Sequence, residues 1–468
     1  MRKLIFAIIL MVGAACAAQN VDIEEIKRMI SRGDLEDAAA MLDSIGRKQP
    51  RNAEVDLLRG RMLMAEFRDV EARESLQAAK KKGSNDANLD LAELAVRNYE
   101  VDEADELLDA YRSYINRNRR KNLTDESGDL DERISRIRTM LDRVEDIVVI
   151  DSLTVDADDF FKAYKLAPDA GRLVDAAGVA VARNAAEATP VYITEDGRKM
   201  LWAEPVGEQG DLRLKSSDHL LGDEWSEPAD VGDFLSPGAD AAYPFLMPDG
   251  VTLYYASNGR GSIGGYDIFI TRDNGNGFLE PQNVGMPYNS PYDDYLLAID
   301  EVTGAGWWAT DRNHLPGEVT IYRFVPTDMR KNVSVDDDEL IARASLRNIA
   351  LTQPEGSDYS ALKAAIERNG AAVATNADDA IEFYMPDGRV IRSKSEISNE
   401  QALARLERYL TEEQSLKEME ARLAQMRSQW HSGKAGTSSA IMKLEQQLTA
   451  KRASVKALRN EAIKALSR

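Results

Sequence analysis

Apolar and small residues recur in the first third of the chain with a regular spacing. Three six-residue segments align without gaps, at 33–38, 67–72 and 99–104. Their alanines, Ala38, Ala72 and Ala104, lie 34 and then 32 residues apart, and a leucine follows each of them by four positions. A period near 34 is typical of helix–turn–helix solenoids, in which a small residue lets two antiparallel helices approach closely. We therefore expect a helical repeat array over residues 20–146.

The end of this array carries one further helical pattern. Ile134, Ile137, Leu141 and Val144 have helical spacing within residues 130–147. The last repeat of a solenoid would otherwise expose its apolar face to water. We expect this helix to cap the array.

The pattern then changes to the alternation typical of β-strands. Three copies of a strand–turn–strand unit follow one another, at 191–202, 244–255 and 295–309. The Asp-Gly turns that start at Asp196 and Asp249 lie 53 residues apart, and Asp-Gly supplies positive φ in a hairpin at little cost. Units of this length with aromatic markers indicate β-propeller blades, so we predict a propeller over residues 147–397.

Three blades are too few for this prediction, because a propeller ring has about four to eight. Two more stretches offer β-strand patterns, at 147–155 and 383–390, and the second repeats a Met-Pro-Asp-Gly turn. We expect about five blades, with helical decorations at 158–187 and 338–370. Strands from both ends of the domain would then close the ring and cover its sheet edges.

The motifs inside these units also resemble a known family. Segments 243–250, 255–258 and 264–269 resemble the PD40 repeat, a WD40-like propeller repeat of TolB-type proteins. With 257–267 and 285–292, the pattern is similar to exported Bacteroidota proteins that join tetratricopeptide repeats to a propeller in the cell envelope. Some of those relatives serve the type IX secretion apparatus and add a peptidoglycan-binding OmpA-like domain, which we do not expect here. The resemblance implies an envelope protein with this architecture.

The last part of the chain, residues 398–468, returns to helical spacing. A capping box at 398–401 precedes an apolar seam with spacings of three and four. A glycine-containing stretch at 431–439 interrupts the seam, and a second seam of similar length follows. We predict an antiparallel coiled-coil hairpin, and dimerisation through this hairpin is an open alternative.

The first residues have the layout of an export signal. Arg2 and Lys3 precede an apolar run at 4–12 and small residues at 13–18. Cleavage after Ala18 would release a soluble protein, whereas cleavage before Cys16 would give a lipoprotein with Cys16 as the lipidated residue. Either form would be exported, to the periplasm or to the outer membrane. Removal of 1–18 leaves 57 Lys plus Arg against 80 Asp plus Glu, a net charge of −23.

Composition narrows the chemistry further. The 468 residues carry a net charge of −21, which disfavours binding to nucleic acid because phosphates need a basic surface. One cysteine excludes a disulfide framework and a thiolate zinc site. Few histidines are available for catalysis or metal binding, and these are His219, His314 and His431. We expect no catalytic residues, no metal and no cofactor.

One loop is a candidate ligand site. Residues 258–267 contain four glycines together with Asn258, Arg260, Tyr266 and Asp267. Backbone amides of a glycine-rich loop can approach an anionic ligand. The alternative is a blade connection that needs glycine for positive φ.

These features predict a non-enzymatic scaffold or adaptor of the cell envelope. Its helical groove and propeller face would bind proteins or peptide segments, and its acidity favours basic segments. Two rival functions stay open. One is a propeller that binds a glycan or an ion, and the other is a hydrolase with Asp249 or Asp267 as carboxylates in the propeller channel.

The two export routes make different predictions for Cys16. If Cys16 is lipidated, cells fed a radioactive fatty acid will label the protein, and Cys16→Ser will lose the label. If the signal is cleaved after Ala18, the wild-type protein will stay unlabelled. Full-length, unprocessed protein in the cytoplasm would contradict export by either route.

Overall fold

A computed structural model describes thirteen stretches of the chain. They are residues 23–117, 124–176, 179–207, 210–220, 224–232, 235–313, 317–327, 329–374, 380–384, 390–394, 397, 399–431 and 438–466. Cys16, the export signal and His314 lie outside them. The chain forms two compact units, one reaching Ser216 and including Pro228–Lys363, the other containing Ser217–Glu227 and Ala364–Arg468.

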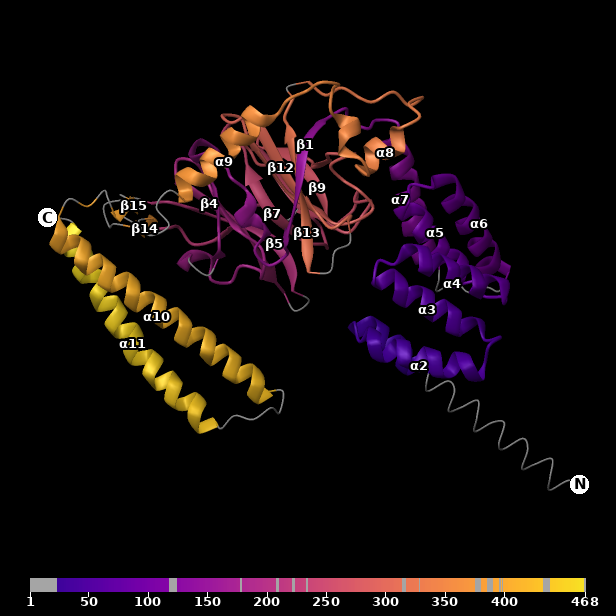
Figure 1. Ribbon diagram of the computed structural model, residues 1–468, viewed down its shortest axis with the longest axis horizontal. Helices are drawn as coiled ribbons and strands as arrows, with labels where there is room; N and C mark the ends of the chain where they lie inside the picture. Colours follow the sequence, from indigo (N-terminus) through magenta and orange to yellow (C-terminus); the bar gives the residue numbers. More distant parts are fainter. Residues whose placement is uncertain are drawn as a thin grey trace, which may run out of the picture. The chain divides into compact units, whose positions relative to one another are not determined.

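The first unit begins with the expected helical repeat-like array (Figure 1). Residues 23–32 are helical, and six more helices follow. They are α2 (Leu35–Lys48), α3 (Ala53–Ala65), α4 (Asp69–Lys81), α5 (Ala87–Arg97), α6 (Val101–Arg117) and α7 (Thr124–Leu141). Helix α7 covers most of the predicted capping helix, and its Ile134 and Ile137 are buried, but it ends at Leu141, before Val144.

The repeats begin at residues that end a helix. Gly33, Phe67 and Tyr99, the first residues of the three aligned segments, have φ of 81°, 55° and 63°. At each, the amide donates to the carbonyl three residues back, and the next amide donates to the carbonyl five residues back. This is the Schellman arrangement, which satisfies the last carbonyls of a helix. Left-handed backbone is unusual for an aromatic residue, and burial of the Tyr99 side chain offsets its cost.

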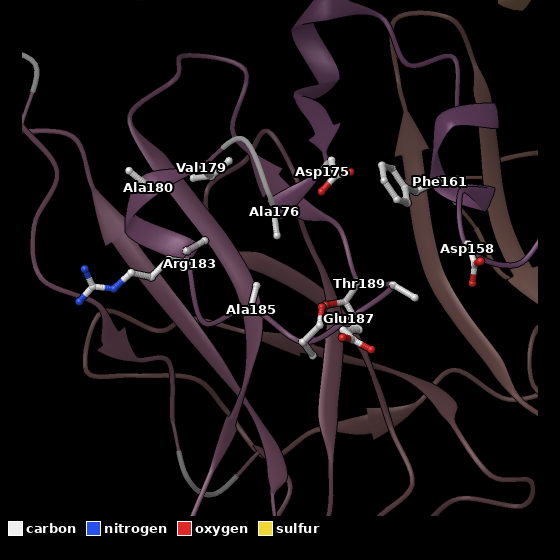
Figure 2. Close-up of a pocket in the computed structure, with 13 residues that line it drawn as sticks. Asp158, Phe161, Asp175, Ala176, Val179, Ala180, Arg183, Ala185, Glu187 and Thr189 are labelled. Atoms are coloured by element: carbon white, nitrogen blue, oxygen red, sulfur yellow. The ribbon is translucent and has the colours of Figure 1, made fainter. Parts of the chain in front are cut away.

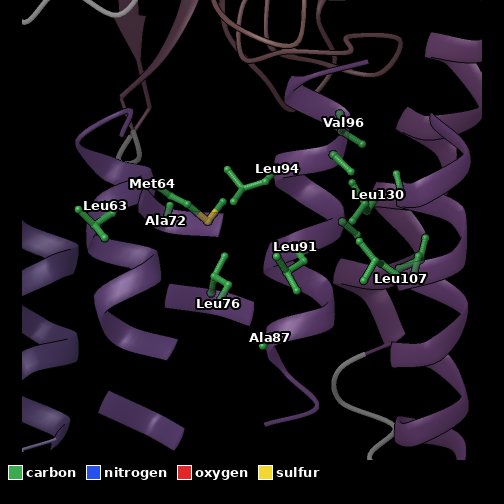
Figure 3. Close-up of a cluster of buried hydrophobic side chains, with 14 of the residues drawn as sticks. Leu63, Met64, Ala72, Leu76, Ala87, Leu91, Leu94, Val96, Leu107 and Leu130 are labelled. Atoms are coloured by element: carbon green, nitrogen blue, oxygen red, sulfur yellow. The ribbon is translucent and has the colours of Figure 1, made fainter. Parts of the chain in front are cut away.

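Small residues let the helices of each repeat pack closely. Ala38, Ala72 and Ala104 are all fully buried. A Cβ atom on Gly60 of α3 would lie 2.5 Å from the side chain of Leu76 in α4, so only glycine fits there. Figure 3 shows leucines from successive helices filling the space between them.

Ion pairs connect helices that are not neighbours in sequence. The pairs are Lys27–Glu54 at 3.1 Å, Arg61–Asp90 at 2.7 Å and Glu93–Arg133 at 2.9 Å. Each joins one helix to the second helix after it. A single exposed pair contributes little, and the series repeats the same link along the array.

Three antiparallel sheets follow the array in the first unit. The first sheet contains β2 (Arg172–Val174), β3 (Val191–Ile193), β4 (Lys199–Val206), β5 (Asp211–Asp218) and β6 (Ala229–Asp230). The second contains β7 (Ala241–Leu246), β8 (Thr252–Ser257), β9 (Asp267–Arg272) and β10 (Gln282–Asn283). The third contains β11 (Asp294–Asp300), β12 (Ala305–Thr310), β13 (Glu318–Val325) and β1 (Val148–Asp156).

The prediction of five blades is wrong for the described residues, which form three sheets of this size and no recognised propeller ring. Residues 147–155 do not start a blade of their own, because β1 pairs with β13 and completes the third sheet. The stretch at 383–390 contributes to a hairpin of β14 (Ala380–Tyr384) and β15 (Val390–Ser393). In the second unit, Phe383 of this hairpin packs in one cluster with Leu406 of the C-terminal helices.

The predicted decorations are partly helical. Within the described part of 158–187 the helical elements are short 3₁₀ turns, η2 (Phe160–Ala163), η3 (Pro168–Ala170) and η5 (Ala180–Ala182), and β2 lies between η3 and η5. Pro168 and Gly171 interrupt this stretch, so a longer helix cannot form there. Residues 338–370 contain α8 (Leu340–Ser345), η7 (Ile349–Thr352) and most of α9 (Ser360–Ala374).

The second unit ends in the predicted helix pair. Helices α10 (Glu400–His431) and α11 (Ser438–Leu466) pack through Leu423, Leu444 and Leu448. Lys451 of α11 forms an ion pair with Glu412 of α10. In the part of the chain that the structure describes, no helix combines the length and the apolarity needed to cross a bilayer.

We predict that enlarging a repeat alanine will destabilise the array. Ala72→Leu inserts a larger side chain between fully packed helices and should lower the free energy of unfolding by about 1–3 kcal/mol. Ala65→Leu, at an exposed position of α3, is the matched control and should have no measurable effect. Urea unfolding of the mature chain measures both, and equal stabilities for the two variants would contradict this packing.

Candidate functional site

The predicted ligand loop directs its aspartate into the protein rather than toward solvent. Asp267 is 0% exposed. Its carboxylate accepts hydrogen bonds from the amides of Ile263 and Gly264, each at 3.0 Å, and from Asn283 Nδ2 at 2.6 Å. Burial raises the pKa of Asp267 to about 7, although these hydrogen bonds act in the opposite direction. Two amides of the candidate anion site therefore bind a side chain of the same loop.

The outer side of this loop meets the capping helix. Arg133 Nε of α7 donates to the Ile263 carbonyl at 3.1 Å, and Arg136 donates to the Ser262 carbonyl at 3.2 Å. The same Arg133 guanidinium holds Glu93 of α5 through both of its terminal nitrogens. The loop is thus a docking site for the helical array within the chain itself.

Apolar contacts extend this interface. Ile263, Met286, Val333 and Ala344 of the β-domain belong to the same buried cluster as the array's helices. Two polar contacts lie at its margin. They are Tyr292 Oη to Asp69 at 3.4 Å and Arg347 to Asn98 Oδ1 at 3.2 Å. The array and the sheets of the first unit therefore share one hydrophobic core.

Asn258 and Tyr266 take part in a different structural contact. The Asp240 amide donates to Asn258 Oδ1 at 2.8 Å, and Asn258 Nδ2 donates back to Asp240 Oδ2 at 3.0 Å. Tyr266 Oη also donates to Asp240, at 2.9 Å. Asp240 accepts a third bond, from the Leu212 amide of the preceding sheet at 2.7 Å. This aspartate therefore joins the first strand of the second sheet to the sheet before it.

The same arrangement recurs 53 residues later. The Asp293 amide donates to Asp311 Oδ1 at 2.8 Å, and Asp293 Oδ1 accepts the Tyr266 amide at 2.7 Å. Burial, with the nearby Asp293 carboxylate, raises the pKa of Asp311 to about 7. The repeated carboxylates thus connect one sheet to the next.

The remaining predicted residues do not converge on one site. Arg260 is exposed, whereas Asp267 is fully buried. Asp249 accepts hydrogen bonds from the Val251 and Thr252 amides in the turn before β8. Partial burial opposes the effect, but these bonds and that from the Thr252 hydroxyl lower the pKa of Asp249 below its usual value.

Asp249 and Asp267 lie at opposite ends of the β8–β9 ladder. Thr252, beside Asp249, pairs with Arg272, whereas Ser257 pairs with Asp267. Five residues of strand at about 3.3 Å each separate the two carboxylates by roughly 17 Å. Acid and base carboxylates of a glycosidase lie about 5–9.5 Å apart. These two residues therefore do not form such a pair.

A cavity that the sequence reasoning missed lies beside the 3₁₀ turns of the first unit (Figure 2). Its volume is about 450 Å³. The lining residues are Asp158, Phe161, Asp175, Ala176, Val179, Ala180, Ala182, Arg183, Ala185, Ala186, Glu187, Ala188 and Thr189. The sequence does contain one indication of this cavity, because residues 176–188 include seven alanines between two strands.

The wall of this cavity is fixed by hydrogen bonds. The Ala186 amide donates to the Ala203 carbonyl of β4 at 2.9 Å, and Thr189 Oγ1 donates to the Ala186 carbonyl at 2.8 Å. Phe161 is buried and contributes an apolar side. Three carboxylates border the cavity, those of Asp158, Asp175 and Glu187.

Comparison with protein-family models and with curated proteins finds no match to this chain. Within the described ranges, His, Cys, Asp and Glu side chains form no group of three suited to a metal ion.

The buried Asp267 predicts a specific pH dependence. Its folded pKa lies above the unfolded value, so protonation favours the folded state, and stability should fall as pH rises from about 4 to 7. Asp267→Asn removes this titration and should give a flatter profile in urea unfolding over that range. Asp336→Asn, at an exposed position, should keep the wild-type profile. An unchanged slope in Asp267→Asn would contradict this prediction.

We predict that Arg133 stabilises the contact between α7 and the loop at 258–267. Arg133→Met keeps an unbranched chain but removes the bonds to Glu93 and to the Ile263 carbonyl. Hydrogen bonds to a charged group contribute about 1.5–3 kcal/mol, so their loss should make local opening of the loop easier. Hydrogen exchange of the 258–267 amides should then be faster by tenfold or more. Arg138→Met, which loses pairs only inside the array, is the control. Equal exchange rates in this loop for both variants would show that Arg133 does not hold it.

Proposed function

We propose that this protein is a non-enzymatic scaffold of the bacterial cell envelope. Its helical array and its β-domain would each present a binding surface to protein partners. The observation that carries the proposal is the Arg133 contact, which joins Glu93 of the array to the Ile263 carbonyl of the β-domain. A contact of this kind would hold the two binding surfaces at a fixed distance and orientation, which a scaffold requires.

The use of the polar groups in the β-domain supports a non-catalytic role. Asp240, Asp267 and Asp293 accept hydrogen bonds from backbone amides of the fold. A catalytic carboxylate instead needs access to substrate and a proton-transfer partner. Asp267, one of the two carboxylates considered for a hydrolase, thus binds backbone amides of its own loop.

We also propose that the three sheets are blades of the PD40 type. The 53-residue recurrence of the Asp240 contact at Asp293 supports a true repeat. Phe160 packs edge-to-face on Tyr243 and Tyr295 at the start of the inner strands β7 and β11. Tyr164 Oη donates to the Leu296 carbonyl of β11 at 2.8 Å. The segment around 160–170 would thus line the inner edge of the sheets.

Export places the scaffold in the periplasm or, if Cys16 is lipidated, at the outer membrane. A mature net charge of −23 favours partners with basic segments. We propose envelope biogenesis or secretion as the process it serves. The C-terminal helix pair would act as a spacer or, through a second copy, as a dimerisation element.

Site-specific photo-crosslinking in intact cells tests this function. A crosslinking amino acid at Arg51 or Lys80 of the array and at Val302 of the β-domain reports on exposed positions of both parts. The proposal expects discrete protein adducts from both. An absence of protein adducts from all three positions, or turnover of envelope glycans or peptides by the purified chain, would overturn it.

A further inference from the structure

The cavity beside the 3₁₀ turns is lined mainly by small and apolar residues, with charged residues among them. Six of its lining residues are alanines, at 176, 180, 182, 185, 186 and 188. Alanine side chains have no rotamers to rearrange, so the backbone alone sets the shape of this part of the wall. A volume of about 450 Å³ lies within the range of about 300–1,000 Å³ that is usual for ligand sites.

The charges around this cavity have one predominant sign. Of the described residues that line it, Asp158, Asp175 and Glu187 are acidic and Arg183 is basic. Figure 2 shows the Arg183 side chain extending away from the three carboxylates. Asp158 and Glu187 are exposed, so their charges face solvent at the border of the cavity.

We infer that this cavity receives the side chain of a lysine or arginine from an extended segment of a partner protein. Such a side chain places its aliphatic stem against apolar surface and its charged head toward carboxylates. The alanine methyls and Phe161 suit the stem, and Asp158 and Glu187 suit the head. An anionic ligand would be repelled by the same carboxylates, and an uncharged apolar ligand would gain nothing from them.

This inference rests on the proposed function, and it specifies which part of the β-domain recognises a partner and by what chemistry. It makes the cavity a recognition site for cationic side chains, separate from the interface that Arg133 forms with the loop at 258–267.

Binding of a fluorescent tetralysine peptide to the mature chain, measured by anisotropy, tests it. The same peptide acetylated on every lysine keeps the side-chain length but loses the charge, and it should not bind. The double variant Asp158→Asn/Glu187→Gln should weaken tetralysine binding about fivefold or more. The control Asp336→Asn/Glu355→Gln changes the net charge by the same amount at exposed positions away from the cavity, and should weaken binding by less than twofold.

A second variant separates the cavity from the overall acidity of the protein. Ala185→Trp fills the cavity without any change in net charge and should abolish tetralysine binding, and Ala180→Trp, at an exposed part of the wall, should do the same. Equal weakening by the two double variants, or unchanged binding in both tryptophan variants, would overturn the inference. If the inference fails but Ala185→Trp still forms protein adducts in the crosslinking experiment, the scaffold proposal is retained. If tetralysine binding depends on the cavity but the crosslinking experiment gives no adducts, the scaffold proposal is wrong and the inference about the cavity is retained.

Discussion

The guanidinium of Arg133 lies where the helical array ends and the sheets begin. It binds Glu93 on one side and the Ile263 carbonyl on the other, and Ile263 itself enters the array's hydrophobic core. The loop can offer that carbonyl because Asp267 draws the Ile263 and Gly264 amides inward. One buried carboxylate therefore shapes the loop, the loop receives the arginine, and the arginine adds polar bonds to the core that the array and the sheets share.

Local periodicity was sufficient to predict the array and the sheets. The repeat starts at Gly33, Phe67 and Tyr99 were visible because a helix must end there, and the structure places all three in left-handed backbone. The 53-residue spacing of Asp-Gly turns likewise follows from hairpin geometry, since each turn requires the same backbone conformation. Such signals lie within a few residues of the feature that they predict.

Features that depend on distant parts of the chain were not predictable in this way. Residues 147–155 read as a strand, but nothing near them indicates that they pair with β13, which is more than 160 residues away. Asp267 was a candidate ligand residue because an aspartate in a glycine-rich loop is compatible both with a ligand site and with a buried turn. The cavity was missed because alanines at 176–188 signal small volume without showing which walls surround it.

Distance measurement between spin labels on the two domains of the first unit tests the central claim most directly. Removal of residues 1–18 removes the one cysteine of the chain, so Glu74→Cys on α4 and Val302→Cys in the turn between β11 and β12 can be labelled selectively at exposed positions. A shared core held by Arg133 predicts one narrow distance distribution, which broadens in Arg133→Met. A broad distribution in the protein with native Arg133 would show that the array and the sheets move independently, and it would contradict this account.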